Sequence, residues 1–81
     1  MILNFEAEIG ETLWDCDAGV SVKPDGSIVA QLLEARRVAE DGEGFVVVRV
    51  EDLDATLRGE LEQRAAAERR EQLEIADERR P

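Results

Sequence analysis

The sequence has no histidine and no tyrosine, and it has one cysteine, Cys16, and one tryptophan, Trp14. Without histidine, the Cys–His and Ser–His pairs of common hydrolases and all histidine metal sites are excluded. A single cysteine cannot close a disulfide within the chain, so nothing indicates an oxidising compartment. We therefore expect no metal, no cofactor and no nucleophilic catalysis of these kinds.

Basic residues are scarce beside acidic ones. Ten Lys and Arg face twenty Asp and Glu, which gives a net charge of -10. Phosphate contacts need clustered basic side chains, so we expect no direct binding to DNA or RNA. No apolar run approaches the roughly 20 residues that span a bilayer, and the first ten residues carry acids where a secretory signal carries bases. We expect a cytoplasmic protein without membrane contact, and we find no pattern for a small-molecule substrate.

The length of 81 residues limits the chain to one domain. A domain of this size buries only about 60% of its unfolded surface, so stability is marginal and a partner or self-association would help. Apolar residues make up 43% of the chain and charged residues 37%. This composition predicts a folded body with a charged appendage rather than disorder.

Short segments at both ends of the first fifty residues have the pattern of strands. Residues 3–9 alternate apolar and polar side chains, and Gly10 and Glu11 sit where a hairpin turn would lead into residues 12–16. Residues 20–23 form a further candidate strand before the turn at residues 24–26, and residues 45–50 are apolar and rich in valine. These segments predict a small antiparallel sheet of three to five strands.

The segment between residues 27 and 40 has two interpretations. Ser27 could cap a helix whose apolar stripe is Ile28, Leu32, Ala35 and Ala39, and the residues between them are good helix formers. Alternatively, residues 27–32 continue the preceding hairpin as a strand. We predict a packed helix around residues 28–40, in which Arg36 and Arg37 belong to a solvated face; the strand is the alternative.

A long charged helix is predicted at the C-terminal end. Residues 53–80 contain no proline, and Asp52 is placed to cap them. Leu57 and Leu61 suit packing on the sheet, whereas residues 62–72 contain nothing more apolar than alanine. We therefore predict an α+β domain with a body at residues 1–61 and a projecting helical extension at residues 62–81.

Asp15 and Asp17 flank Cys16, and this motif is the strongest candidate for chemistry. Over about six residues it resembles the nucleophile strand of haloacid-dehalogenase-type phosphatases, in which two aspartates and magnesium carry phosphoryl transfer. The chain is too short for that family's α/β domain, and no later lysine or acidic metal pair can be placed. We interpret both aspartates as solvent-facing residues of a strand end and expect no enzyme activity.

Two functions fit these features. The first is a non-catalytic protein–protein interaction or assembly module, like small accessory proteins of phages and mobile elements, that docks on a protein partner or a second copy through its C-terminal helix and sheet edge. The second is an acidic mimic of nucleic acid that blocks a DNA- or RNA-binding enzyme, because phage-borne inhibitors such as anti-CRISPR proteins are similar in size and acidity. The predicted interface residues are Trp14, Leu57, Leu61, Leu73 and Ile75. The predicted acidic surface consists of Glu6, Glu8, Glu11, Asp15 and Asp17.

Overall fold

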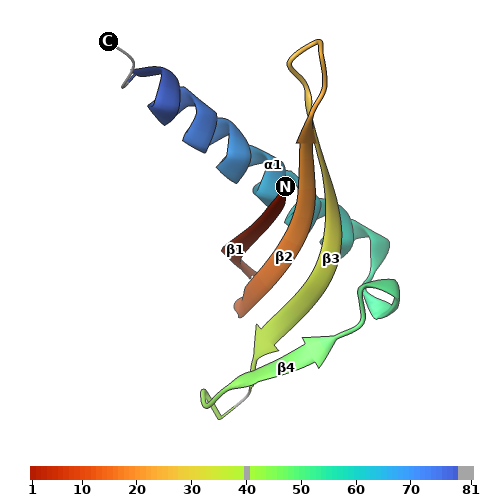
Figure 1. Ribbon diagram of the computed structural model, residues 1–81. Helices are drawn as coiled ribbons and strands as arrows, with labels where there is room; N and C mark the ends of the chain where they lie inside the picture. The colour runs from red at the N-terminus through yellow and green to blue at the C-terminus, as the bar shows by residue number, and fades with distance from the viewer. Residues whose placement is uncertain (40, 79–81) are drawn as a thin grey trace.

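A four-stranded antiparallel sheet and one long helix make up the computed structural model, which describes residues 1–39 and 41–78. The strands follow one another across the sheet in the order of the sequence, and a short 3-10 helix connects the last strand to the long helix (Figure 1). This architecture confirms the predicted α+β class and the antiparallel sheet. The elements are β1 (Ile2–Ile9), β2 (Thr12–Val22), β3 (Ile28–Val38), β4 (Phe45–Val48), η1 (Val50–Asp52) and α1 (Ala55–Glu78).

The first hairpin forms where the alternation predicts it. Ile9 pairs with Thr12, so Gly10 and Glu11 are the two turn residues, and their φ angles are 58° and 66°. Two consecutive positive φ angles define the turn whose twist matches that of the flanking strands. The turn fixes the register of β1 on β2, so that alternate side chains of both strands face α1.

The prediction of a packed helix around residues 28–40 is wrong, because residues 28–38 form strand β3. Opposite β2 the register changes from Asp17 paired with Glu34 to Ala18 paired with Leu32, which leaves Leu33 as an extra, bulged residue. The bulge changes which side chains face α1, so that Leu32 and Ala35, three residues apart, are both buried beneath it. With Ile28 four residues before Leu32, and Ala35 three residues after it, the spacing imitates the apolar stripe of a helix. Residue 40, the end of the predicted helix, lies outside the described residues.

The bulge is held by a contact from the helix. The backbone N–H of Leu32 donates a hydrogen bond to Oε2 of Glu62, at an N···O distance of 2.8 Å. Arg58, one turn earlier on α1, lies 3.7 Å from the same carboxylate oxygen. A buried or half-buried N–H without a partner is costly, so this side chain replaces a sheet hydrogen bond at the bulge.

Helix α1 begins slightly later than the sequence predicted. Residues 50–52 form η1, and the side chain of Asp54, rather than that of Asp52, caps α1 by accepting a hydrogen bond from the N–H of Thr56 at 3.0 Å. Within the described ranges, no helix is both long and apolar enough to cross a membrane. Residues 79–81 of the predicted extension lie outside the described residues.

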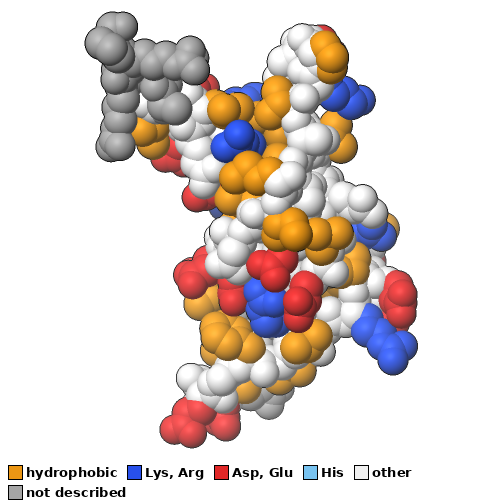
Figure 2. Space-filling model, in the orientation of Figure 1, with side chains coloured by type: hydrophobic (Ala, Val, Ile, Leu, Met, Phe, Trp, Pro, Cys, Tyr) orange, Lys and Arg blue, Asp and Glu red, His pale blue; other side chains and the backbone are white. Residues whose placement is uncertain are grey.

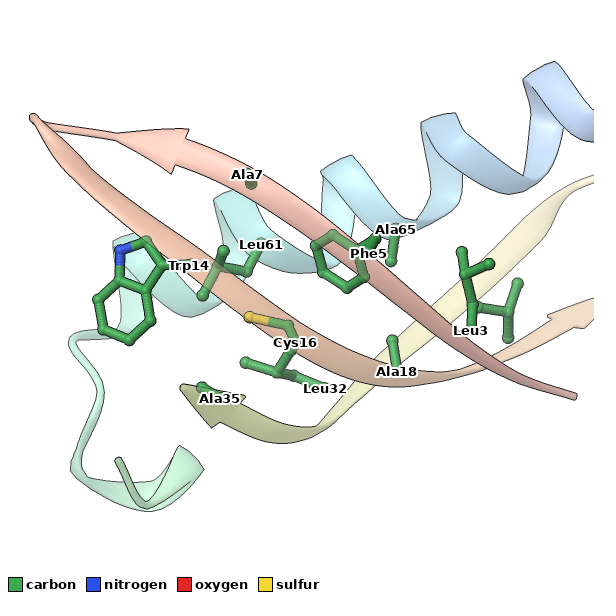
Figure 3. Close-up of a cluster of buried hydrophobic side chains, with 11 residues drawn as sticks. Leu3, Phe5, Ala7, Trp14, Cys16, Ala18, Leu32, Ala35, Leu61 and Ala65 are labelled. Atoms are coloured by element: carbon green, nitrogen blue, oxygen red, sulfur yellow. The ribbon is translucent and has the colours of Figure 1, made fainter. Parts of the chain in front are cut away.

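The core lies between α1 and one face of β1, β2 and β3, where the helix crosses the strands (Figures 1 and 3). In the close-up, Trp14 and Leu61 lie near one another at one end of the core, and Phe5 and Ala65 lie further along the helix. Packing therefore continues past residue 61, the predicted end of the body, at least to Ala65. The buried hydrophobic residues are Leu3, Phe5, Ala7, Trp14, Cys16, Ala18, Val20, Leu32, Ala35, Leu61 and Ala65.

Candidate functional site: the open face of the sheet

The face of the sheet opposite α1 is not covered by any described element, and we call it the open face (Figure 1). Strand alternation and the register place Asn4 of β1, Asp15 and Asp17 of β2 and Arg36 of β3 side by side on it. Glu34, two residues from Arg36, belongs to the same face. Asn4, Asp15, Asp17, Glu34 and Arg36 are called the polar cluster below.

Hydrogen bonds and ion pairs join the whole polar cluster. Nδ2 of Asn4 donates to Oδ1 of Asp15 and to Oδ1 of Asp17, both at 2.9 Å, and also approaches the carbonyl oxygen of Cys16 at 3.2 Å. From the other side, Nε of Arg36 donates to Oδ2 of Asp15 and Nη1 donates to Oδ2 of Asp17, both at 3.3 Å. Nη1 of Arg36 also lies 3.1 Å from Oε2 of Glu34. The two aspartates are therefore held between an amide and a guanidinium.

These contacts stabilise the charged forms of the cluster. Hydrogen bonds from Asn4 and then Arg36 hold the pKa of Asp17 below its usual value. The pKa of Arg36 is raised, chiefly by its hydrogen bond to Asp17 and further by Asp15. Both side chains of this pair are thus charged at neutral pH. The cluster works as a fixed ion-pair network in which Asp17 is held in its charged form.

Hydrophobic side chains surround the polar cluster on the open face. In Figure 2 a basic side chain flanked by acidic ones lies near the middle of this face, with hydrophobic side chains above and below. Six exposed apolar residues belong to this face, and the alternation and the register place five of them there. The sixth is Leu33 in the bulge. A Cβ added to Gly19, which lies on the open face, would be 3.7 Å from Cδ1 of Leu33, so Leu33 also lies over this face. The six are Ile2, Leu13, Val29, Leu33, Phe45 and Val47.

The predicted interface residues do not gather on one surface. Trp14 and Leu61 are buried in the core, and Leu57 packs half-buried against it, so these three residues hold α1 on the sheet instead of offering an exposed anchor. Leu73 is half-buried on the far part of α1, and the side chain of Ile75 is 41% exposed. Of the five, Leu73 and Ile75 are the two that are not part of the core or packed against it.

The five residues of the predicted acidic surface fall into two groups, one of which belongs to the polar cluster. Glu6, Glu8 and Glu11 are exposed, the first two on the open face and the third in the hairpin turn. Asp15 and Asp17 are half-buried and paired with Arg36. Sequence reasoning missed Asn4 and Arg36 as members of this site. The alternation of β1 already placed Asn4 on the face opposite the core, but Arg36 could be placed there only once β3 is a bulged strand.

Cys16 lies between the two aspartates but points the other way, into the core (Figure 3). Burial raises the pKa of its thiol to about 11, with the nearby carboxylates of Asp15 and Asp17 as smaller causes. A buried thiol with so high a pKa is a poor nucleophile. Across residues 1–39 and 41–78, no three cysteine, aspartate or glutamate side chains are grouped as a metal site would require.

Two open hollows lie at the ends of the first strands. One, of about 390 Å³, is lined by residues 11–13 and 37–39, and the other, of about 340 Å³, lies beside Met1, Ile2 and Gly19. Neither brings together an acid and a base that could transfer a proton, nor a set of donors for phosphate. We therefore take the open face, and not these hollows, as the candidate functional site. Comparisons with protein-family models, curated proteins and solved structures found no match for this chain.

Proposed function

We propose that this chain is a non-catalytic protein–protein interaction module that binds its partner through the open face. The observation that carries the proposal is the packing of α1 on one face only, which leaves Ile2, Val29 and Leu33 exposed on the other face. These side chains lie on one side of a polar cluster whose members already hold one another in place. Apolar patches around ordered polar groups are typical of protein-binding surfaces, because little side-chain entropy is lost on docking.

The charge of the open face indicates the chemistry of the partner. The polar cluster contains three acids and one base, and Glu6 and Glu8 add two acids beside it. A basic protein surface with apolar side chains is complementary to such a face. The same face of a second copy would bring like charges together, and nucleic acid would be repelled for the same reason. We therefore propose a basic protein partner, and we keep the cytoplasm as the proposed compartment.

The far part of α1 is a second contact in this proposal. Leu73 and the exposed Ile75 are apolar side chains of α1 beyond the alanines at 65–67, and none of the side chains from residue 66 to residue 75 is fully buried. A partner that lies on the open face and reaches α1 would bury both surfaces. The sequence-based expectation of docking through the helix is thus retained as a secondary contact.

The acidic mimic of nucleic acid is the alternative function. The exposed carboxylates of Glu6, Glu8 and Glu11 support it, because phosphate mimicry needs free negative charge. The pairing of Asp15 and Asp17 with Arg36 weighs against it, because Arg36 is itself part of the surface that would imitate phosphates. The two functions differ in which side chains carry the affinity.

Matched variants separate the two functions. Leu33→Gln removes an apolar side chain from the open face, and Val22→Gln removes one of similar exposure from the opposite face of the same hairpin, without a change of charge. Each variant and the native chain are used to capture partners from the cells that carry the gene, and the affinity for each purified partner is then measured. A partner of the proposed kind binds the native chain and Val22→Gln equally and binds Leu33→Gln at least about tenfold more weakly.

Two other results would contradict the proposed function. One of them supports the acidic mimic, and the other rules out binding through the open face. If Leu33→Gln binds normally while Glu6→Gln with Glu8→Gln abolishes binding, the chain acts through its charge and the apolar face is not the site. If no captured protein distinguishes Leu33→Gln from Val22→Gln and none depends on the glutamates, the open face is not a binding surface.

A further inference from the structure

Strand β4 is an exposed hydrophobic edge. It is the last strand of the sheet, it lies beyond the strands that α1 crosses (Figure 1), and β3 is the one strand paired with it among the described residues. Phe45 and Val47 are 54% and 64% exposed on the open face, and Val46 is 39% exposed on the other face. An uncharged edge of this kind is a template for pairing with another strand, and proteins normally block such edges with charges, proline or a covering element.

The backbone groups of β4 that point away from β3 can be assigned. The N–H of Ala39, the residue after β3, donates to the carbonyl oxygen of Gly44 at 3.1 Å, so Gly44 and Ala39 form a hydrogen-bonded pair that extends the ladder between β3 and β4. Hydrogen-bonded residues alternate along an antiparallel strand, so Val46 and Val48 also bond to β3. The N–H and C=O groups of Phe45 and Val47 therefore point outward, to the free edge.

The opposite edge of the sheet is protected in a way that β4 is not. The exposed side chains of β1 include Glu6 and Glu8, and self-pairing of β1 would bring these carboxylates of two copies against one another. Strand β4 carries no charge. Residues 28–50 around it contain four acids and three arginines, whereas residues 1–27 contain six acids and one lysine. The β4 edge is therefore the part of the sheet at which two acidic copies repel each other least.

We propose that two copies of this chain pair antiparallel along β4, about a twofold axis at Val46, and form one continuous sheet. Such an axis is perpendicular to the sheet, so the open faces of both copies lie on the same side. Twice the four strands of one copy gives an eight-stranded sheet, with the two copies of β4 at its centre. The occupant of this edge is thus a second copy of the chain.

This register satisfies the free groups of the edge. Phe45 of each copy lies opposite Val47 of the other, and because these residues carry the outward N–H and C=O groups, they form the hydrogen-bonded pairs. Val46 lies opposite Val46 as a non-hydrogen-bonded pair on the axis. Arg49, just after β4, lies near Glu43, just before the second copy's β4. Arg49 is exposed, and it lies 3.7 Å from Glu51. The edge is therefore complementary to itself in hydrogen bonding and charge.

Pairing along β4 uses the edge of the sheet and leaves the open face free, so it can fail while the proposed function holds, and the reverse is also true. If both hold, the two open faces form a single surface across the dimer. A basic partner with two equivalent sites would then bind with higher apparent affinity.

The register is tested with charges placed on the twofold axis. Val46→Lys and Val46→Glu each bring like charges face to face in a homodimer, whereas an equal mixture of the two variants brings opposite charges together. We expect the mass of the native chain in sedimentation to rise with concentration from 9.0 kDa toward twice that value. Each Val46 variant alone stays at 9.0 kDa, and the mixture regains the double mass. Val22→Lys, which adds the same charge at a position 47% exposed and away from β4, still dimerises.

Several results would overturn the proposal. The proposal fails if the native chain stays at 9.0 kDa at every concentration, or if both Val46 variants dimerise like the native chain. If the mixture of variants does not regain the double mass, the axis does not pass through Val46. Circular dichroism checks that each variant is folded, and Val47→Lys, at a more exposed position of the same edge, replaces Val46→Lys if that variant unfolds. If the native chain is monomeric and captures another protein, and Val46→Lys no longer captures it, the β4 edge pairs with that protein instead of a second copy.

Discussion

At the scale of single residues, the pair of aspartates around Cys16 is explained by what lies beside it in the sheet. Asp15 and Asp17 are separated by one residue, so both point to the open face while Cys16 points into the core. The sequence was enough to predict that the aspartates face away from the core, but it placed them at the end of a strand, whereas both lie half-buried within β2. Their arginine partner could not be predicted, because Arg36 comes from a segment interpreted as a helix.

The charge of Asp17 should make stability depend on pH. Its pKa is lowered in the folded protein by Asn4 and Arg36, so its contribution to stability is complete above the pKa of the unfolded chain, near 3.8, and is lost as the pH falls through the lower, folded pKa. Asp17→Asn should therefore cost about 1 kcal/mol of unfolding free energy at pH 7, because the contact is partly open to solvent, and less in acid. Urea unfolding at pH 7 and near pH 3 measures both values.

An exposed position provides the control for this experiment. Glu60→Gln changes a carboxylate on an exposed part of α1. It should shift the free energy of unfolding by less than about 0.5 kcal/mol at either pH. If Asp17→Asn loses as much stability near pH 3 as at pH 7, its effect comes from packing and not from the charge of the folded carboxylate.

At the scale of elements, the bulge in β3 decides how much of the fold the sequence could predict. Strand β1 and the start of β2 were predicted from period-two alternation and a turn of two residues, and β4 from a run of valines, which are local signals. Residues 12–22 form one strand where two, at 12–16 and 20–23, were predicted, and β4 ends at Val48 instead of residue 50. In β3 the extra residue Leu33 interrupts the alternation, and the apolar positions then have the spacing of a helix. The correct choice depends on the ladder with β2 and on a hydrogen bond from Glu62, thirty residues away, and neither is visible in local sequence.

The contact between Glu62 and the bulge should therefore matter for stability. Glu62→Ala leaves the N–H of Leu32 without its acceptor in a half-buried position, which should cost about 1–3 kcal/mol of unfolding free energy. Glu62→Gln keeps an oxygen acceptor and should cost clearly less. Chemical denaturation measures both, with Glu60→Ala on the exposed side of the same helix as the control. Equal stability of Glu62→Ala and Glu60→Ala would show that the bulge does not need this bond.

At the scale of the whole molecule, one helix covers one face of a small sheet, and the rest of the apolar surface is exposed. A chain of 81 residues has no second helix to cover the open face within its described part, and β4 ends the sheet without a cover. From the size of the chain we expected that a partner or self-association would help the stability of the domain. It could not predict where, because the exposed surface follows from the bulge and from the position of α1.

Salt should affect self-association in a direction that net charge predicts. Each copy carries a charge of -10, so two copies repel each other at a distance while the β4 contact itself is apolar. Raising the salt concentration from about 0.02 to 0.5 M screens this repulsion and should tighten the dimer severalfold. Sedimentation at fixed protein concentration gives the dissociation constant at each salt concentration. A dimer that weakens with salt would be held mainly by ion pairs, contrary to pairing through Phe45, Val46 and Val47.

The account depends most on the claim that the sheet is left incomplete at β4 and is completed by another strand. Residue-resolved amide hydrogen exchange at Phe45 and Val47 tests this claim directly, with Val46 and Val48, which bond to β3, as internal references. In dilute solution we expect fast exchange at Phe45 and Val47 and slow exchange at Val46 and Val48. As the protein concentration rises, Phe45 and Val47 should become as protected as their neighbours. If both exchange fast at every concentration, including any at which the mass has doubled, the edge of β4 is not where this protein pairs.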